Sequence, residues 1–437
     1  MRIAVVGSGI AGLGSAWLLS RAHEITLFEA ADYLGGHTHT HDVELGGERF
    51  AVDTGFIVHN PQHYPLLAQL FSELGVETQD TVMSFSVRNE RTGLEYNSAT
   101  LATLFCQRRN WFSPRFHRMW LDIMRFYREA PALLAGPGPG PTLAEYLQAH
   151  NYSTVFRDDH LVPMAAALWS APAHAVLEFP ARFLVRFMAN HQMLQVNGRE
   201  PWRVVSGGSA RYVRALQARW TVRERIGCSV HSVAREERGV WVHSAAGREH
   251  FDQLVLACHS DQALGLLADA GEDERALLGA IPYQRNTVVL HTDAAFLPRH
   301  RRALAAWNVL LPAEPQSSAT ISYCMNLLQS LQAPQPLIVS LNPSRPIDAS
   351  RILKRLEYSH PQLTHAGLAA QAHRSSIQGR RRTWFAGAYW GFGFHEDGLR
   401  SAVEVAQGLG VTWRPSTVRV PEPVLQPGSG GEEEWTT

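Results

Sequence analysis

The sequence predicts an α/β protein of two lobes, one of them built on a parallel β-sheet. Residues 3–7 form a short apolar run that leads into a glycine-rich turn, as in a strand buried on both faces of a parallel sheet. Similar short strand patterns return at 24–28 and at 251–257. At 437 residues the chain is too long for one ordinary core and suits two or three lobes.

The composition excludes several classes of protein. Hydrophobic residues make up 45% and charged residues 18%, which is typical of a globular chain. A formal net charge of zero argues against a nucleic-acid binder, which needs a dominant basic face. No apolar run approaches 18 residues, and the apolar run after Met1 has only strand length, so we expect neither a spanning helix nor a secretory signal. We expect a cytoplasmic protein.

The first turn reads Gly-Ser-Gly-Ile-Ala-Gly and stands between the first strand and an expected helix at 13–20. Its first glycine permits the tight turn, its second lets the backbone approach a pyrophosphate, and its third lets helix and strand pack closely. Free N–H groups at the helix N-terminus then face the phosphates. The residues expected at this phosphate site are Gly7, Gly9, Ile10, Ala11 and Gly12.

An acidic residue supports this interpretation. Glu29 directly follows the second strand, about 20 residues after the first glycine, where a carboxylate accepts hydrogen bonds from the adenosine ribose. A glycine-rich turn without a ligand is the alternative, and the motif alone does not separate NAD from FAD. The order of strand, turn, helix, strand and acid favours a dinucleotide site.

Two segments that follow carry a family resemblance. Leu34-Gly35-Gly36-His37 comes soon after Glu29, and Val52-Asp53-Thr54-Gly55-Phe56 follows a predicted hairpin. Together with the first turn they resemble the superfamily of flavin-dependent amine oxidases, protoporphyrinogen oxidases and phytoene desaturases. The resemblance implies FAD as the cofactor. It places the second segment beside the isoalloxazine, and the contacts it implies are Gly35, Gly36, His37, Gly55 and Phe56.

The resemblance continues in later segments. It implies that the backbone of Val230 meets the adenine and that Gly387 lies beside the pyrophosphate and ribityl chain. After a glycine-rich crossing, a helix is expected to begin near Asp397, and a helix N-terminus stabilises negative charge on a reduced flavin. A capped surface helix is the alternative. The residues expected beneath the flavin pyrimidine are Asp397, Gly398 and Leu399.

The domain organisation also follows from the resemblance. We expect a discontinuous, Rossmann-like FAD-binding lobe into which an α+β substrate lobe is inserted. The tail is rich in Pro, Gly, Ser and Glu and is expected to be disordered. The expected FAD-binding segments are 1–60, 200–275 and 378–415, the substrate lobe comprises 61–199 and 276–377, and the tail is 421–437.

Two departures weaken the likeness to amine oxidases. Many of those enzymes have Ala-Gly-Glu where this chain has Ala386-Gly387-Ala388. A lysine serves their flavin N5, and here the only lysine, Lys354, stands in a segment (351–358) whose pattern predicts a helix.

A closer similarity is to a bacterial group known only as predicted NAD/FAD-binding proteins. That group tends to be encoded beside cyclopropane-fatty-acid-synthase-like genes, which implies lipid acyl chains as substrates. The segments that carry this similarity are 286–293, 307–308, 323–326, 341–343 and 358–361.

Candidates for acid–base chemistry are His395 and Glu396, which precede the predicted helix, and the weaker candidate Tyr323; packing is the alternative for each. The histidines at 37, 39 and 41 alternate and would share one side of a strand. No carboxylate or cysteine lies near them at ligand spacing, so we expect no metal.

Aromatic and methionine residues recur at helical spacing between Trp111 and Tyr127, opposite several arginines. One interpretation is a basic amphipathic helix that contacts lipid headgroups, and the other is an ordinary helix with one face in the core.

The sequence therefore predicts an FAD-dependent oxidoreductase that transfers hydride from a substrate C–H bond to flavin N5. The leading substrate is an unsaturated or methyl-branched fatty acyl chain that is desaturated or isomerised. The alternatives are an amine or polyamine oxidase and a flavin-binding partner protein without turnover. We expect a small-molecule or lipid substrate, peripheral contact with the inner membrane face, and no nucleic acid. Nothing in the pattern specifies an oligomeric state.

Overall fold

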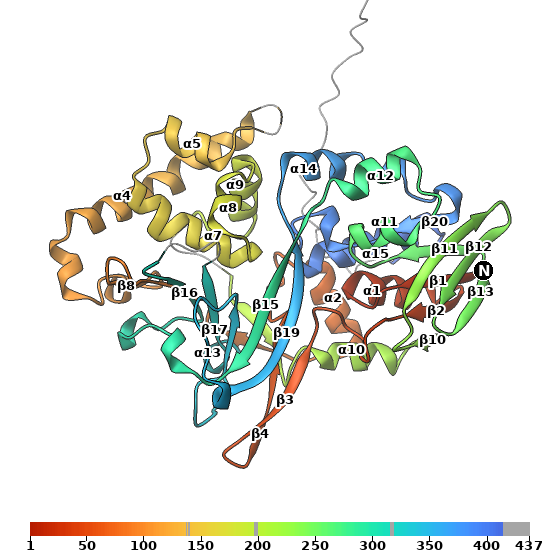
Figure 1. Cartoon of the computed structure of the whole chain (residues 1–437), viewed down its shortest axis with the longest axis horizontal. Helices are drawn as coiled ribbons and strands as arrows, with labels where there is room; N and C mark the ends of the chain where they lie inside the picture. The colour runs from red at the N-terminus through yellow and green to blue at the C-terminus, as the bar shows by residue number, and fades with distance from the viewer. Residues whose placement is uncertain (137, 139, 196–199, 315–318, 414–437) are drawn as a thin grey trace, which may run out of the picture.

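The computed structural model describes residues 1–136, 138, 140–195, 200–314 and 319–413 (Figure 1). The predicted tail at 421–437 lies outside these residues. Figure 1 shows a lobe with a parallel sheet on the right and a block of helices on the upper left. The long paired strands β15 (Tyr283–His291) and β19 (Ile352–Pro361) run between them.

The parallel-sheet lobe contains the two N-terminal strands predicted from the sequence. Five strands lie in the order β10-β2-β1-β14-β20, and every pair is parallel. Side chains alternate between faces, so Ile3 and Val5 pack with the helices while Ala4 and Val6 face the other side. The strands are β1 (Arg2–Val6), β2 (Glu24–Phe28), β10 (Val222–Arg225), β14 (Gln253–Leu256) and β20 (Thr383–Phe385).

Helices cover one face of this sheet and a small antiparallel sheet covers the other. The helices are α1 (Ile10–Leu19), α2 (Pro65–Leu74), α10 (Ala210–Gln217) and α15 (His395–Gly408). The small sheet is β11 (Val230–Glu236), β12 (Gly239–Ser244) and β13 (Gly247–Phe251).

A seven-stranded sheet forms the base of the other lobe, in the order β19-β15-β18-β17-β16-β7-β8. The predicted helix at 351–358 is wrong, because this segment is strand β19 and pairs along its length with β15. Lys354 therefore lies on a strand, opposite Leu290, and is exposed. The remaining strands are β7 (Phe85–Asn89), β8 (Leu94–Asn97), β16 (Trp307–Leu311), β17 (Thr320–Cys324) and β18 (Ile338–Leu341).

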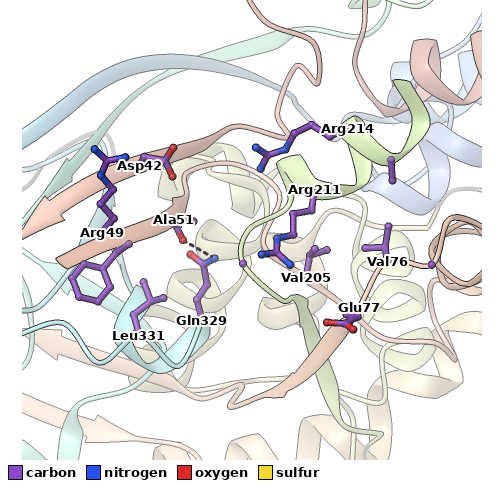
Figure 2. Close-up of a pocket in the computed structure, with 14 residues that line it drawn as sticks. Asp42, Arg49, Ala51, Val76, Glu77, Val205, Arg211, Arg214, Gln329 and Leu331 are labelled. Carbon is purple, nitrogen blue, oxygen red and sulfur yellow. Dashed lines mark hydrogen bonds between the residues drawn. The ribbon is translucent and has the colours of Figure 1, made fainter. Parts of the chain in front are cut away.

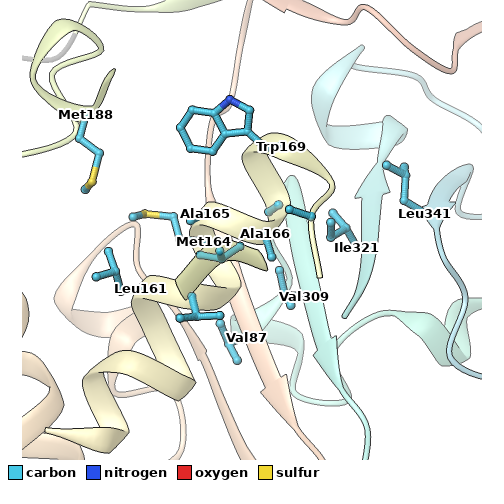
Figure 3. Packing of buried hydrophobic residues seen from close by; sticks show 14 of the residues in the cluster. Val87, Leu161, Met164, Ala165, Ala166, Trp169, Met188, Val309, Ile321 and Leu341 are labelled. Atoms are coloured by element: carbon cyan, nitrogen blue, oxygen red, sulfur yellow. The ribbon is translucent and has the colours of Figure 1, made fainter. Parts of the chain in front are cut away.

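Helices pack on this sheet and enclose a large apolar core. Figure 3 shows α7 lying over the sheet, with Met164 and Trp169 among the packed side chains and Val309 and Ile321 below. The helices of this block are α4 (Pro114–Glu129), α5 (Leu143–Ala149), α7 (Val162–Trp169), α8 (Ala173–Leu177) and α9 (Ala181–Asn190).

The aromatic helix predicted near 111–127 begins later than expected, at Pro114. Phe116 and Phe126 are buried on its inner face, as in an ordinary core helix. Trp111 and Phe112 instead lie in a preceding 3-10 turn (Arg108–Phe112) and are 56% and 87% exposed. Within the described chain, no helix is both long and apolar enough to cross a membrane.

A hairpin and a buried carboxylate join the two lobes. The hairpin is β3 (Thr40–Leu45) and β4 (Glu48–Asp53). Asp53 is fully buried and accepts hydrogen bonds from the backbone N–H of Ser209 (2.9 Å) and from Gln329 Nε2 (3.1 Å). Ser209 precedes α10, while Gln329 follows α13 (Met325–Leu328) next to the large sheet. Residues that flank α10 and α13 therefore meet at this junction, and the exact domain boundaries stay a prediction.

Candidate cofactor site and active site

The glycine turn has the geometry that its three glycines predicted. Gly7 adopts φ +98° and donates to the carbonyl of Phe28 at 2.8 Å, which joins the turn to β2. A Cβ at Gly12 would lie 1.9 Å from the carbonyl oxygen of Gly7, so only glycine fits there. Gly9 is the N-cap of α1, and a Cβ on it would find no atom within 4 Å. The open space stands directly in front of the helix N-terminus.

That N-terminus suits a pyrophosphate. No side chain caps α1, so the N–H groups of its first turn, at Ile10, Ala11 and Gly12, have no side-chain acceptor. Unsatisfied N–H groups and the positive end of the helix dipole form an anion site. Glu29 lies beside the turn, where its carboxylate accepts hydrogen bonds from Ser8 N (2.9 Å) and Ser8 Oγ (2.6 Å). These residues fit the phosphates and adenosine of FAD.

The double-glycine loop closes over the same turn. Gly35 donates to the carbonyl of Ser8 at 3.1 Å, and a Cβ at Gly36 would lie 3.0 Å from the Cα of Gly9. Both glycines have positive φ, +131° and +58°, which favours glycine. Gly55 then packs on the carbonyl of His37, where a Cβ would approach to 2.1 Å. The predicted segments around residues 35 and 55 are thus in direct contact.

The C-terminal segment meets the first helix. A Cβ at Gly398 would lie 2.7 Å from Ile10 Cγ2, and one at Gly14 would lie 2.8 Å from Leu399 Cδ1. Helix α15 begins at His395, two residues before the expected start. Gly387 is tied to the same helix, because its N–H donates to Ser401 Oγ at 2.9 Å. Residues nearly 390 apart in sequence are therefore in contact, and their role at the cofactor stays a prediction.

His395 lies at the centre of a compact polar and aromatic group. Its ring stacks on Phe56 with centroids 3.7 Å apart, and its Nε2 lies 3.0 Å from Thr38 Oγ1. Thr38 Oγ1 in turn lies 2.5 Å from the hydroxyl of Tyr212. Loss of solvation lowers the pKa of His395 to about 3, so the imidazole is neutral near pH 7. A neutral imidazole donates one hydrogen bond through its N–H and accepts one at its other ring nitrogen.

Both carboxylates at the start of α15 are engaged by backbone N–H groups. Glu396 accepts from Leu66 N (3.0 Å) and Leu67 N (3.1 Å), the first turn of α2. Asp397 accepts from Phe394 N at 3.0 Å and so caps its own helix. Loss of solvation raises the pKa of Glu396 to about 7 and that of Asp397 to about 6. The predicted acid–base role of Glu396 stays a prediction beside this structural one.

A cluster of rings next to His37 was not predicted. His37 lies 4.8 Å from Tyr358, 5.1 Å from His360 and 6.2 Å from His259, measured between ring centroids. Its Nε2 is buried and has no hydrogen-bond partner among the described residues. Loss of solvation, reinforced by the neighbouring histidines, keeps its pKa well below 6.5. A buried, unpaired ring nitrogen beside the glycine loops fits a polar atom of the flavin.

One sequence signal could have found part of this cluster. His259 lies three residues after the end of β14, and ligands of parallel sheets gather at the carboxyl ends of the strands. His360 comes from β19, and Asn286 Nδ2 on β15 lies 3.0 Å from its Nδ1. Only the antiparallel pairing of β15 with β19 brings His360 to the site.

Two predicted residues lie further from this centre. The ring of Tyr323 is buried under α7, where its hydroxyl donates to the carbonyl of Ala167 at 3.4 Å. Val230 begins β11 and packs against the cluster that contains Val6 and Phe28, and its contact with the adenine stays a prediction.

The alternating histidines do not share one strand, because β3 begins only at Thr40. His39 stacks on Tyr33, while His37 turns toward His360. Among the described residues, no group of three or more His, Cys, Asp or Glu is arranged to hold a metal ion.

Solved structures share this fold over nearly the whole chain. A CLA-producing fatty acid isomerase from P. acnes superposes with a TM-score of 0.67 at 17% identity, covering 93% of this chain and 98% of that chain. Cyclohexylamine oxidase from Brevibacterium oxydans IH-35A gives a TM-score of 0.66 at 15% identity, covering 94% and 99%. At such identities the likeness shows the fold alone.

Two curated relatives match over shorter stretches. Tryptophan 2-monooxygenase of Allorhizobium ampelinum is 29% identical over 170 residues, and L-amino-acid oxidase of Pseudechis australis is 32% identical over 82 residues. These stretches cover 35% and 18% of this chain, but only 20% and 15% of the relatives' own length.

The family model for flavin containing amine oxidoreductases matches residues 10–342, most of the chain. Its match includes α1, the double-glycine loop and most of the large sheet. The chain therefore belongs to the flavin containing amine oxidoreductase family and is an FAD-dependent oxidoreductase.

Proposed function

We propose that this enzyme oxidises or isomerises an unsaturated or methyl-branched fatty acyl chain. Bound FAD supplies hydride acceptance, and the protein orients the substrate and excludes water. The expected contacts with the cofactor are those described above, from the glycine turn through Glu29, the double-glycine loop, Val230 and α15.

The observation that carries the proposal is the aromatic cluster packed around the segment that leads to α15. Phe183 and Phe187 on α9 pack against Phe392, with ring centroids 4.7 and 5.5 Å apart, and Phe394 stacks on Phe187 at 5.1 Å. Trp169 Nε1 donates to the carbonyl of Phe392 and fixes this segment to α7. Aromatic rings bind acyl chains through dispersion and apolar area, without a need for charge.

The charges next to this aromatic cluster argue against an ammonium substrate. Glu396 is occupied by the backbone of α2, and Asp397 by that of Phe394. Lowered pKa values keep His37 and His395 neutral at pH 7. A cationic amine entering here would lose its hydration without gaining a free carboxylate.

One observation favours an amine or polyamine oxidase as the second candidate. Lys354 lies on a strand of the large sheet, as the flavin-serving lysine of those oxidases is expected to. The positive charge of Lys354 lowers the pKa of His39 and of His41, however. Both of these histidines lie on the hairpin side rather than beside His360. The acyl proposal therefore remains the better supported.

Anaerobic mixing of the FAD-loaded enzyme with candidate substrates tests the two proposals. Unsaturated and cyclopropane or methyl-branched fatty acids are expected to bleach the flavin absorption or to yield a double-bond isomer detected by gas chromatography. Putrescine and cyclohexylamine are expected to leave both readouts unchanged. Bleaching by the amines alone would overturn the acyl proposal and support the oxidase.

We also propose that the enzyme is cytoplasmic and touches an anionic membrane surface through the segment around Phe112. Leu101, Trp111 and Phe112 are 64%, 56% and 87% exposed. Arg108 and Arg109 are exposed in the same 3-10 turn. Aromatic tips with flanking arginines match the interface of a membrane that contains acidic lipids.

A further inference from the structure

A second cavity lies away from the glycine turn, between the hairpin β3–β4 and helix α10 (Figure 2). Its volume is about 820 Å³. Arg49 enters it from the hairpin, while Arg211 and Arg214 enter from α10. Neither the first glycine turn nor the double-glycine loop lines it, so the cavity is separate from the cofactor's phosphate site.

Among the described residues, the three arginines have no partner for their guanidinium groups. Within the described part of the chain, none of their guanidinium groups donates a hydrogen bond or forms an ion pair. Elsewhere the chain satisfies such groups, as where Arg235 pairs with Asp269 and Glu274. Each free guanidinium offers five N–H donors in a planar fork that matches a carboxylate or phosphate.

Arg211 is exposed, but its guanidinium packs against the backbone of the loop before α10. Gly207 adopts φ +75°, and a Cβ on it would lie 2.6 Å from Arg211 Nε and 2.7 Å from Arg211 Cζ. The guanidinium therefore lies against the bare backbone of Gly207, in space that another residue's side chain would fill. Figure 2 shows this group aimed into the cavity toward Ala51 and Gln329.

The floor of the cavity is rigid and partly apolar. Gln329 Nε2 donates to the carbonyl of Ala51 (3.3 Å) and to Asp53 (3.1 Å), and its Oε1 accepts from Asp53 N. Val205 and Leu331 add apolar surface beside these polar groups. Small-molecule sites combine fixed donors with apolar walls in this way.

Two carboxylates also border the cavity. Asp42 lies on the hairpin wall, and Glu77 follows α2. Neither pairs with the arginines in the described structure, and each can accept a hydrogen bond from a hydroxyl group. The lining therefore suits a ligand that carries both anionic and hydroxyl groups rather than a bare inorganic anion.

We propose that the cavity between Arg49, Arg211 and Arg214 binds a small hydroxylated organic anion, with a carboxylate or phosphate group on the arginines. The site is distinct from those of FAD and of the oxidised substrate. The apolar floor contacts the carbon skeleton of this ligand, and Asp42 or Glu77 accepts from its hydroxyl group.

Isothermal titration of the FAD-loaded full chain tests the site with citrate and glycerol 3-phosphate, and glycerol serves as the neutral control. At least one anion is expected to bind while glycerol does not. Arg211→Gln and Arg214→Gln should each weaken binding about tenfold or more, as for a charged hydrogen bond.

Arg238→Gln, an exposed arginine in the turn between β11 and β12, should bind like the wild type. The flavin spectrum is recorded for every variant, so that a failure of the cofactor site is distinguished from a failure of this one. The proposal is overturned if neither anion binds, or if both α10 variants bind as tightly as the wild type.

Discussion

Gly398 of the last helix lies directly against Ile10 of the first, so that a single Cβ at residue 398 would come within 2.7 Å of Ile10 Cγ2. This contact joins the two segments that we expect to hold the pyrophosphate and the flavin ring. The contact can be tested directly, because a substitution at residue 398 creates a steric clash and a substitution at residue 10 relieves it.

Gly398→Ala is expected to weaken FAD binding about tenfold or more, although alanine itself favours a helix. The added methyl group must push α15 away from α1. The double variant Ile10→Ala/Gly398→Ala removes Cγ2 and should recover most of the affinity, measured by flavin fluorescence titration. The double variant Ile10→Val/Gly398→Ala keeps a γ-methyl group at residue 10 and should give little recovery of the affinity. Equal affinity of the two double variants would contradict the proposed contact.

Gly9→Ala should separate cofactor binding from folding. Gly9 has φ −63°, which alanine adopts readily, and its Cβ would meet no atom of the protein. The thermal midpoint of the FAD-free chain should therefore stay within about 1 °C, while FAD affinity falls about tenfold or more. Gly265→Ala on α11 (Ser260–Leu266), whose Cβ also meets nothing, is the control and should change neither. Normal FAD affinity in Gly9→Ala would show that the pyrophosphate lies elsewhere.

Protonation of His160 should make the lobe with the seven-stranded sheet less stable in acid. The ring is buried with its Nδ1 2.9 Å from the hydroxyl of Tyr96, and burial lowers the pKa of His160 from 6.5 to about 4. Because the unfolded chain binds the proton more readily, the stabilisation is complete above pH 6.5 and is lost as the pH falls toward 4. Between pH 7 and pH 5 the loss is about 2 kcal/mol for this group.

The measurement is urea unfolding at both pH values. His160→Asn keeps a partner for Tyr96 and should show a smaller loss of unfolding free energy on acidification than the wild type. His231→Asn, at an exposed position on β11, should behave like the wild type. An identical acid sensitivity of wild type and His160→Asn would contradict the assignment.

Membrane contact through Phe112 predicts co-sedimentation with vesicles of phosphatidylcholine and phosphatidylglycerol but not with pure phosphatidylcholine. Phe112→Ala should reduce binding about tenfold, since burial of one aromatic side chain contributes about 1.5–3 kcal/mol. Val82→Ala removes an exposed apolar side chain elsewhere and serves as the control. Equal binding to both kinds of vesicle would show that the arginines do not contribute by binding acidic lipids.

Local signals made the first half of the cofactor site predictable. The turn from Gly7 to Gly12, Glu29 and the double-glycine loop are each specified by residues within about 40 positions, whose backbone demands are visible in the sequence. The start of α15 was also visible, because glycines, an acidic first turn and an apolar stripe occur together.

The rest depended on long-range pairing. The segment around Lys354 has helix-like spacing, but β15 supplies a partner strand and tertiary pairing overrides local pattern. Sheet topology alone brings His360 to His37. The partner of Glu396 lies 330 residues away, so no local window could show that this carboxylate holds the first turn of α2.

The hydrogen bonds that Glu396 accepts from the first turn of α2 have a consequence for biosynthesis. During translation α2 emerges long before residue 396, and its first N–H groups lack this acceptor until residue 396 leaves the ribosome. The pocket for the prosthetic group is complete only then, because β20 and α15 arrive together. Nascent chains stalled short of that point should remain colourless and open to proteases.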